Sequence, residues 1–226
     1  MNGLAGFLDK LGAEMVQRTY EHVFLTFVAM AIAILVAVPL GIALARSRRP
    51  GLTSAIMGLA GVIQTVPSLA LIALIVVVFK VVSWPTVGVV PALVALVLYA
   101  LLPLLRNTYT GIRQVDEATI EVATGMGMTS GQILFQVELA LALPVIMAGI
   151  RIATVWTIGI ATLCGLIGAG GLGYLILQGL RSVQTDYLLA GTLPAAALAL
   201  LFDGILGWVE GWLTPEGLRT KAERSK

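Results

Sequence analysis

Very few side chains of this chain could do chemistry by themselves. His22 is the only histidine and Cys164 the only cysteine, so no second imidazole or thiol can complete a metal site or an intrachain disulfide with them. We expect His22 to be an interfacial residue, Cys164 to be a small core hydrophobe, and no metal to be bound. No G-x-x-x-x-G-K-[ST] phosphate-binding loop occurs, so the chain is not expected to hydrolyse ATP. We also expect that it is not an enzyme.

Four glycines lie within the six residues GAGGLG, 168–173, which have the literal spacing G-x-G-x-x-G. A dinucleotide site with this spacing needs a preceding strand and a βαβ unit, whereas an apolar helical segment precedes it here. We therefore reject a dinucleotide cofactor. Two alternatives remain open, an outer gate of pliable backbone or a plain helix end and turn, and both concern Gly168, Gly170, Gly171 and Gly173.

Polar residues surround a proline inside one long apolar segment. They are Gln64, Thr65 and Ser68, around Pro67. A broken helix with polar side chains is tolerated in a membrane where it lines a cavity. We expect this set to border a translocation path; the alternative is a proline kink whose backbone groups are satisfied between helices.

One acid lies deep in another apolar run. Asp203 stands within AALALLFDGILGW, and an acid at such depth should face the bundle interior or water. It either lines the path, where it would attract a cationic head group, or has a structural role, which we favour: it satisfies backbone groups or pairs with a basic residue such as Arg151. Trp156 is expected to pack rather than to bind a cation.

The elements that must position these residues are membrane helices. Hydrophobic residues make up 58% and charged residues 12% of the 226, about half the charged fraction of soluble domains. A net charge of +2 gives no reason to expect a nucleic-acid partner. Apolar runs of about twenty residues suit helices that cross a bilayer, and they do not alternate as barrel strands do. We predict an all-α, polytopic protein forming one membrane domain, 1–226, with five transmembrane helices at about 23–45, 53–82, 87–105, 143–168 and 187–213.

The basic residues predict the orientation in the membrane. With the N-terminus outside, ten of the 14 Lys and Arg residues lie on the cytoplasmic side, led by the cluster RSRRP after the first helix. This places an insert, 106–142, and the tail, 214–226, in the cytoplasm. Residues 1–20 have helical apolar spacing and are predicted to form a short amphipathic helix on the outer surface.

The cytoplasmic insert has the features of a docking surface. Asp116 and Glu117 suit a helix N-terminus, and Thr119, Ala123 and Gly127 then share one stripe of small residues that admits close approach. The insert also contains apolar side chains whose exposure to water would be unfavourable, Met126, Met128 and Phe135. We expect a short helix, a glycine turn and a second helix that bind a cytoplasmic partner; the alternative is a loop that packs only on its own helix ends.

The insert also resembles a known signature. Cytoplasmic loops of ABC-transporter permeases carry E-A-A-x3-G-x9-I-x-L-P, and four positions match in register, Glu121, Ala123, Gly127 and Leu139, while Val122, Val137 and Ala140 depart from it. The resemblance implies a type I importer permease fold and a coupling helix seated in a cytoplasmic ABC ATPase dimer. It implies ATP and Mg²⁺ on that partner and no cofactor on this chain. A second permease subunit, of the same or a sister chain, and an extracytoplasmic solute-binding protein would complete the assembly.

Other stretches, above all VIQTVPSLALIAL and IGAGGLG, are similar to the osmoprotectant branch of these permeases. That branch imports glycine betaine, carnitine, choline or proline across the cell membrane. The related permeases for amino acids such as methionine are the first alternative. An ATP-independent secondary transporter or channel would show inverted repeats, which we do not find. A scaffold that docks an enzyme but moves no solute is the remaining class.

Overall fold

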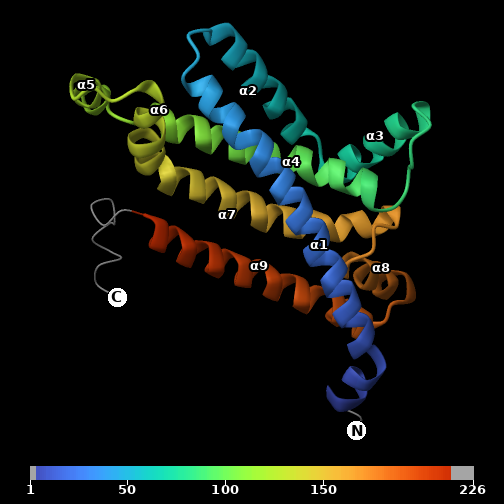
Figure 1. Cartoon of the computed structure of the whole chain (residues 1–226). Helices are drawn as coiled ribbons and strands as arrows, with labels where there is room; N and C mark the ends of the chain where they lie inside the picture. Colours follow the sequence, from blue (N-terminus) through green and yellow to red (C-terminus); the bar gives the residue numbers. More distant parts are fainter. Residues whose placement is uncertain (1–3, 215–226) are drawn as a thin grey trace.

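The computed structural model describes residues 4–214, and within that range every regular element is a helix (Figure 1). The long helices are α1 (Leu4–Ala45), α2 (Pro50–Thr65), α3 (Ser68–Val81), α4 (Val89–Arg113), α7 (Leu139–Leu163) and α9 (Thr185–Leu213). Shorter ones are α5 (Glu117–Gly125), α6 (Ser130–Gln132), a π-helix (Ile133–Glu138), a 3₁₀ turn (Cys164–Ile167) and α8 (Leu172–Ser182). The all-α prediction is confirmed.

Four helical stretches are long and apolar enough to cross a membrane: Leu11–Ala45, Val89–Arg113, Ser130–Ile167 and Thr185–Leu213. The remaining predicted span is a broken one, because α2 and α3 meet at an angle of 105°. Pro67 lacks an N–H and disfavours helical backbone in the residue before it, and Val66 accordingly has extended backbone, with ψ of 126°. The break predicted at Pro67 is therefore confirmed.

The N-terminal region differs from the prediction. Residues from Leu4 onward are continuous with the first span in one helix of 42 residues, so no separate short helix ends near residue 20. The reason lies in the junction QRTYEHVF, which contains no proline or glycine. Arg18 also pairs with Glu14 at 3.7 Å and with Glu21 at 3.0 Å, at spacings that stabilise a continuous helix.

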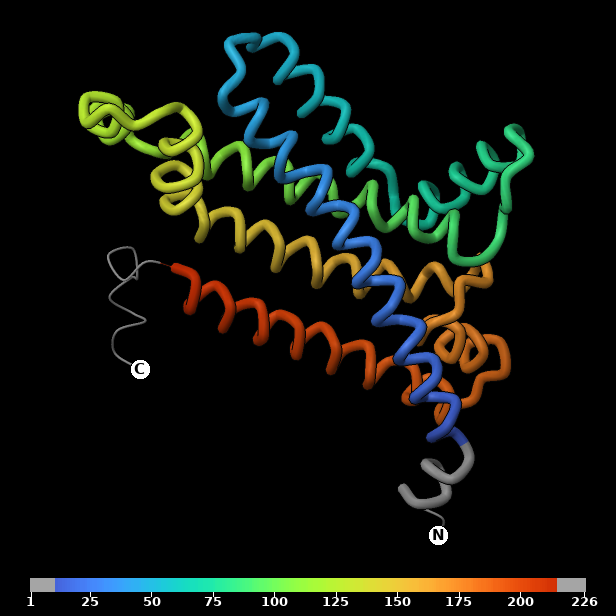
Figure 2. The backbone as a smooth tube through the Cα atoms, viewed as in Figure 1, coloured from blue at the N-terminus to red at the C-terminus, as the bar shows by residue number. Residues whose placement is uncertain are grey.

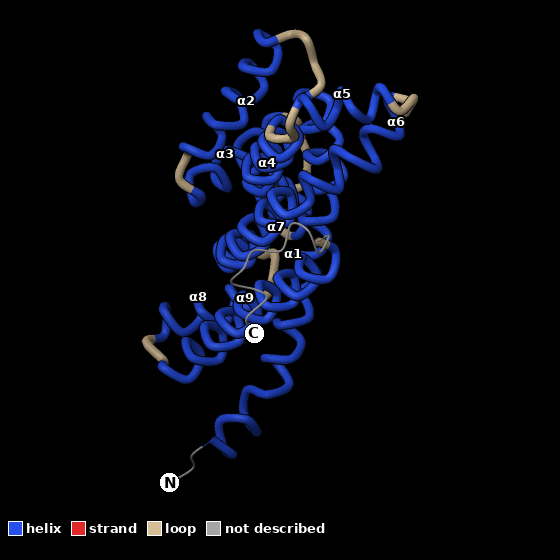
Figure 3. Tube along the Cα trace, turned by 90° about the vertical axis from the view of Figure 1, so that its left-hand side faces the viewer, coloured by secondary structure: helices blue, strands red, loops and turns tan. Residues whose placement is uncertain are grey.

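The helices place the connections at two ends of the bundle (Figures 1 and 2). The α1–α2 loop, α5, α6 and the end of α9 lie toward one end, on the left of Figure 1. The start of α1, the α3–α4 loop and α8 lie toward the other. Figure 3 views the molecule from the left-hand end of Figure 1 and shows helices joined by short loops. Segments predicted to be cytoplasmic thus share one end. The predicted tail lies outside the described residues except for Thr214.

Small residues let the central helices pack closely around α4. Ala33 and Ala37 of α1 and Ala153 of α7 are fully buried in one cluster with Ala100 of α4. An added methyl group at Gly149 of α7 would come within 2.6 Å of the Asn107 side chain. Close backbone approach of this kind is the usual source of helix association in membranes. In contrast, α2 has no buried residue in this chain.

Candidate functional site

The helix α5 begins where the sequence predicts a helix N-terminus. The Asp116 carboxylate accepts a hydrogen bond from the Ala118 backbone N–H at 3.1 Å, and Glu117 occupies the first turn. Both features stabilise a helix start, the first by capping and the second through the helix dipole. The helix ends at Gly125, and Gly127 follows with a left-handed φ of +83°. The predicted short helix and glycine turn are confirmed.

Exposed apolar side chains on α5 and in the segment that follows it accompany the acid Glu121. Glu121 and Val122 are exposed, and Met126 and Phe135 are each 71% exposed. Ala123, in contrast, is buried. We call Glu121, Val122, Met126 and Phe135 the coupling face. Apolar side chains this exposed at the end of a bundle are typical of a surface that another chain covers.

The other three matching residues of the predicted signature, Ala123, Gly127 and Leu139, do not belong to the coupling face. A side chain at Gly127 would meet no atom within 4 Å, so within this chain the glycine is required by its positive φ and not by close approach. Leu139 is half-buried at the start of α7. Ala123 contributes its backbone as well, because its carbonyl accepts a hydrogen bond from the Met128 N–H that closes the turn.

A second helix starts directly after this turn. The Thr129 hydroxyl accepts a hydrogen bond from the Gln132 N–H, and the Gln132 side chain accepts one from the Thr129 N–H at 2.8 Å. This reciprocal capping box fixes the helix start. Six residues of π-helix, Ile133–Glu138, then lead into α7. Such π-segments are rare and frequently mark functional sites.

Arg46, the first residue of the basic cluster RSRRP, ties the insert to the end of α1. Arg46 donates to the Ser130 hydroxyl at 2.8 Å and to its carbonyl at 3.2 Å, and its Nε lies 3.4 Å from Oε2 of Glu138. The Glu138 side chain is only 7% exposed. We call Arg46, Ser130 and Glu138 the arginine clamp. The only sequence signal for this ion pair is an acid among apolar residues, together with a basic cluster far away along the chain.

At the break between α2 and α3 the backbone is partly satisfied. The Tyr99 hydroxyl of α4 donates to the Val66 carbonyl, and the Thr65 hydroxyl donates to the Val62 carbonyl at 2.7 Å. The buried amide nitrogen of Gln64 has no partner within the described part of the chain. The bonds to the carbonyls fit a satisfied kink, whereas the unpaired Gln64 amide fits a polar path. Ser68 starts α3 directly after Pro67.

Asp203 pairs with the arginine that the sequence favoured. Nε and one terminal nitrogen of Arg151 donate to the two carboxylate oxygens of Asp203 at 3.0 and 3.1 Å. The other terminal nitrogen donates to Glu210 at 3.0 Å. Two parallel bonds of this kind are the strongest arrangement of a guanidinium and a carboxylate. The predicted pairing of Arg151 with Asp203 is confirmed.

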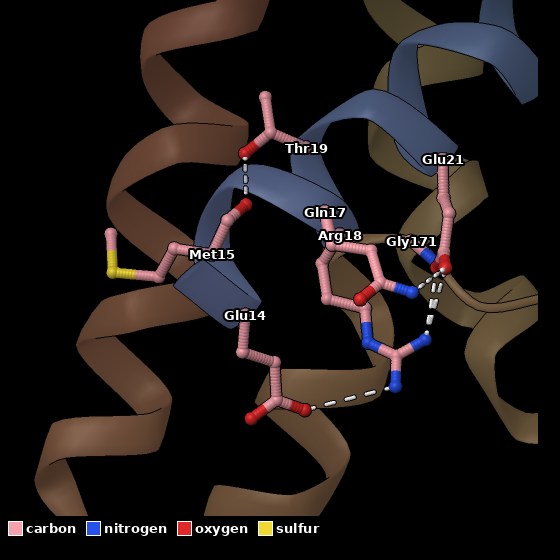
Figure 4. A network of polar contacts seen from close by, with 7 residues as sticks. All are labelled: Glu14, Met15, Gln17, Arg18, Thr19, Glu21 and Gly171. Atoms are coloured by element: carbon pink, nitrogen blue, oxygen red, sulfur yellow. Dashed lines mark hydrogen bonds and ion pairs between the residues drawn. The ribbon is translucent and has the colours of Figure 1, made fainter. Parts of the chain in front are cut away.

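The glycine loop carries a polar network at the opposite end of the bundle (Figure 4). The Gly171 N–H donates to Glu21 at 2.8 Å, and Glu21 also accepts from Arg18 at 3.0 Å. The Arg18 guanidinium lies 4.0 Å from the centre of the Tyr174 ring. Gly168, Gly170 and Gly171 all have positive φ, between +69° and +77°, so the loop has the tight turn that glycines permit.

His22 corrects one expectation. It is fully buried, not interfacial, and its Nε2 lies 3.1 Å from the Ile158 carbonyl. Its side chain faces α7 at Ile158 and the glycine loop at Gly171. Cys164 is buried, as predicted.

Among the glycines whose surroundings the structure describes, Gly173 has the tightest, and it supplies a stability prediction. An added methyl group would overlap the Thr162 backbone, which cannot move aside easily. We expect Gly173→Ala to lower the stability of the folded protein by roughly 1–3 kcal/mol. Gly159→Ala is the control, because that position in α7 has open space and alanine is the better helix former. Thermal unfolding of the purified chain in detergent measures both, and an unchanged Gly173→Ala protein would contradict the packing described here.

Known proteins place this arrangement in a family. Residues 37–215 match the family described as "Binding-protein-dependent transport system inner membrane component". The choline transport system permease protein OpuBB of Bacillus subtilis (strain 168) is 44% identical over the full length of both chains. The osmoprotectant import permease protein OsmW of Salmonella typhimurium is 39% identical, over 95% of each chain. A solved structure of the MetNI methionine ABC transporter in an inward-facing conformation superposes with a TM-score of 0.80 at 21% identity, over 89% of this chain and 96% of that one.

Fold and insert together therefore define an ABC transport permease, a multi-pass membrane protein with the fold of type I importers. The chain belongs to the binding-protein-dependent transport system inner membrane component family. The likeness to the methionine transporter concerns the fold alone, whereas the relatives alike over the whole chain have names that refer to osmoprotectants. The amino-acid alternative is thus less well supported than the osmoprotectant one.

Proposed function

We propose that this chain is the membrane-spanning subunit of an ABC importer for quaternary-ammonium osmoprotectants such as glycine betaine, carnitine or choline. The support for the solute class is full-length similarity, at 44% and 42% identity, to permeases named for choline and for glycine betaine, carnitine and choline. In the proposed orientation the N-terminus lies outside and the C-terminal tail in the cytoplasm. Two permease subunits, the same or sister chains, form the pathway, and an extracytoplasmic protein delivers the solute.

The observation that carries the ATP-driven part of the proposal is the coupling face. An ATPase dimer below the membrane would receive α5 of each permease, with Val122 and Met126 in an apolar groove and Glu121 in polar contacts at its edge. ATP and Mg²⁺ bind to that partner, and this chain carries no cofactor. α2 has no buried residue, and its exposed apolar side chains offer a surface for the second permease or for lipid.

The contacts suggest how movement of the ATPase would reach the membrane. α5 contacts the π-helix, which continues into α7 without a loop. The arginine clamp joins the same segment to the end of α1. Closure of the ATPase dimer on ATP would therefore displace α1 and α7 together. The change from inward- to outward-open is a population shift, driven by the different affinity of the two states for ATP.

We propose that the break at Gln64, Thr65, Pro67 and Ser68 borders the path. A Gln64→Leu change removes the unpaired amide while keeping a similar volume, so we expect a several-fold change in KM or maximal rate of solute uptake. Thr53→Val, at a half-buried position in the first turn of the same helix and away from the break, is the control. If uptake kinetics in the assembled complex are unchanged by Gln64→Leu, the break is only a satisfied kink.

We also propose that the loop 168–173 is an outer gate element. Its conformation depends on Gly168, Gly170 and Gly171, and its position depends on the bond to Glu21. Glu21 of α1 holds the backbone of this loop, so a movement of α1 away from the loop would release it.

The experiment that tests the function is uptake of labelled glycine betaine. Cells without other osmolyte importers would express this chain with its neighbouring ATPase and binding protein, at low and high external osmolarity. Uptake that stops with a catalytically inactive ATPase would support both the ATP-driven mechanism and the solute class. Uptake that continues would favour a secondary transporter. No betaine uptake from an assembled complex would exclude betaine and direct the search to choline, carnitine and amino acids.

A further inference from the structure

A cavity of about 460 Å³ opens beside α7 and α9 and is not explained by the coupling face. Its lining on α7 comes from one helix face, at spacings of three and four residues, and α9 contributes one acid. The lining residues are Ala148, Arg151, Ile152, Val155, Trp156 and Asp203. The volume suits a small organic ligand.

The ion-pair cluster beside this cavity has an unbalanced formal charge. Arg151 carries one positive charge, and its two partners, Asp203 and Glu210, carry one negative charge each. The formal charge of the cluster is therefore −1. The Asp203 side chain keeps 44% of its surface exposed despite the ion pair. Its carboxylate is thus both the partner of Arg151 and part of the cavity wall.

Arg151 and Asp203 lie well inside their helices, and Arg151 shares its charge with Glu210 near the end of α9, so the Asp203 carboxylate is only partly neutralised at that depth. Arg151 lies at the middle of the 25-residue helix α7, far from both helix ends. An unbalanced charge at such a depth is costly unless water or a counter-ion meets it. The open cavity provides the place where a cation can do so.

The remaining lining selects the kind of cation. Trp156 is 50% exposed at the cavity, in contrast to the packing role expected for it from the sequence. The face of an indole ring attracts ammonium groups, most of all those that cannot be satisfied by hydrogen bonds. Ala148, Ile152 and Val155 offer aliphatic contacts for methyl groups. A metal ion would need several oxygen ligands instead, and no group of three or more acidic, His or Cys residues suited to one occurs among the described residues.

We propose that this cavity is a membrane-embedded subsite for the quaternary ammonium group of the solute, held between the Trp156 ring and the Asp203 carboxylate. The inference rests on the proposed function for the identity of the solute, but the binding of a quaternary ammonium ion can be measured independently. Arg151 acts as a positioning residue, because its bidentate bond fixes the Asp203 carboxylate at the cavity wall.

The test is a ligand-observed NMR titration of the purified complex in lipid nanodiscs, with tetramethylammonium as the probe. We expect saturable binding that weakens about tenfold in Trp156→Leu and by a similar factor in Asp203→Asn. Trp156→Phe keeps an aromatic face and should retain part of the affinity. Trp208→Leu is the matched control, since Trp208 is an exposed tryptophan of α9 outside the cavity lining.

Competition with choline and with its neutral isostere 3,3-dimethyl-1-butanol separates charge from shape. Choline should displace the probe and the isostere should not. Equal displacement by both, or unchanged binding in Trp156→Leu, would overturn the proposal. Trp156→Leu leaves the ion pair intact, so this outcome stays interpretable even if Asp203→Asn fails to assemble.

Uptake by the same variants distinguishes the two proposals. Normal betaine and choline uptake by Trp156→Leu, together with absent probe binding in the wild type, would remove the subsite while the importer stands. Probe binding that depends on Trp156, in a complex that imports no osmoprotectant, would keep the subsite and remove the solute assignment.

Discussion

A Gly127→Asp variant is expected to insert into the membrane normally, yet to lose its ATPase partner and its solute uptake. Gly127 follows the coupling helix and is exposed next to Met126. A carboxylate there would have to be buried against the apolar groove of the partner. An unpaired charge in such an interface costs several kcal/mol, and roughly 3 kcal/mol corresponds to about a 100-fold weaker complex.

Two further variants at this position separate charge from backbone strain. Asparagine tolerates the left-handed conformation that Gly127 adopts and has no charge, so Gly127→Asn should keep most of the ATPase. Valine is a strong outlier at a φ of +83° and should distort the turn without adding charge.

Co-purification of the ATPase with the tagged permease measures association, and labelled solute uptake measures coupling. Normal ATPase recovery with Gly127→Asp would show that this end of α5 does not dock as proposed. Equal loss in the Asn and Asp variants would assign the effect to the turn and not to charge.

The second large effect is expected at the arginine clamp, and it should be asymmetric. Arg46→Ala leaves the Glu138 carboxylate unpaired in surroundings where its side chain is 7% exposed, and removing one partner of a buried pair costs about 3–5 kcal/mol. Glu138→Gln instead leaves Arg46, which is 32% exposed and still bonded to Ser130. We expect this second change to cost about 1 kcal/mol.

The clamp variants also test the connection between α1 and the coupling segment. Arg46→Ala should lower uptake at least tenfold while the ATPase stays bound and active, because the coupling face is untouched. The double variant Arg46→Ala, Glu138→Gln should recover stability relative to Arg46→Ala alone, since no buried charge remains.

Thermal unfolding of the four proteins forms a double-mutant cycle, and the ratio of ATP hydrolysed to solute imported measures coupling. An additive cycle would show that Arg46 and Glu138 do not interact energetically. Unchanged coupling in Arg46→Ala would show that α1 moves independently of the insert.

Much of the fold follows from local features of the sequence. Long apolar runs must form helices in a membrane, because every backbone group has to be satisfied within the segment. Pro67 interrupts the second run through its own geometry, and Asp116 and Gly127 mark the two ends of α5 by capping and by positive φ. Each of these signals acts within a few residues, so no knowledge of the bundle is needed. The prediction of a separate N-terminal helix was wrong, because no residue between 15 and 25 ends the helix.

The pairs that make up the candidate sites could not be predicted in the same way. Arg46 and Ser130 are 84 residues apart, and Glu21 and Gly171 are 150 apart. Arg151 and Asp203 were matched from the sequence because few charges lie within the spans. Glu210 was missed as the third member, since it lies near the end of α9, after the apolar run that contains Asp203.

The sequence by itself determined which segments are helices, where the second span breaks and which short motif forms the helix and glycine turn of the insert. Only the tertiary structure decided which helix face meets which. It buried His22 and Ala123, exposed Trp156 beside Asp203, and joined Arg46 to Glu138. The physical reason is that helical periodicity is set by neighbours along the chain, whereas the rotation of each helix is set by close packing against α4 and its other neighbours in the bundle.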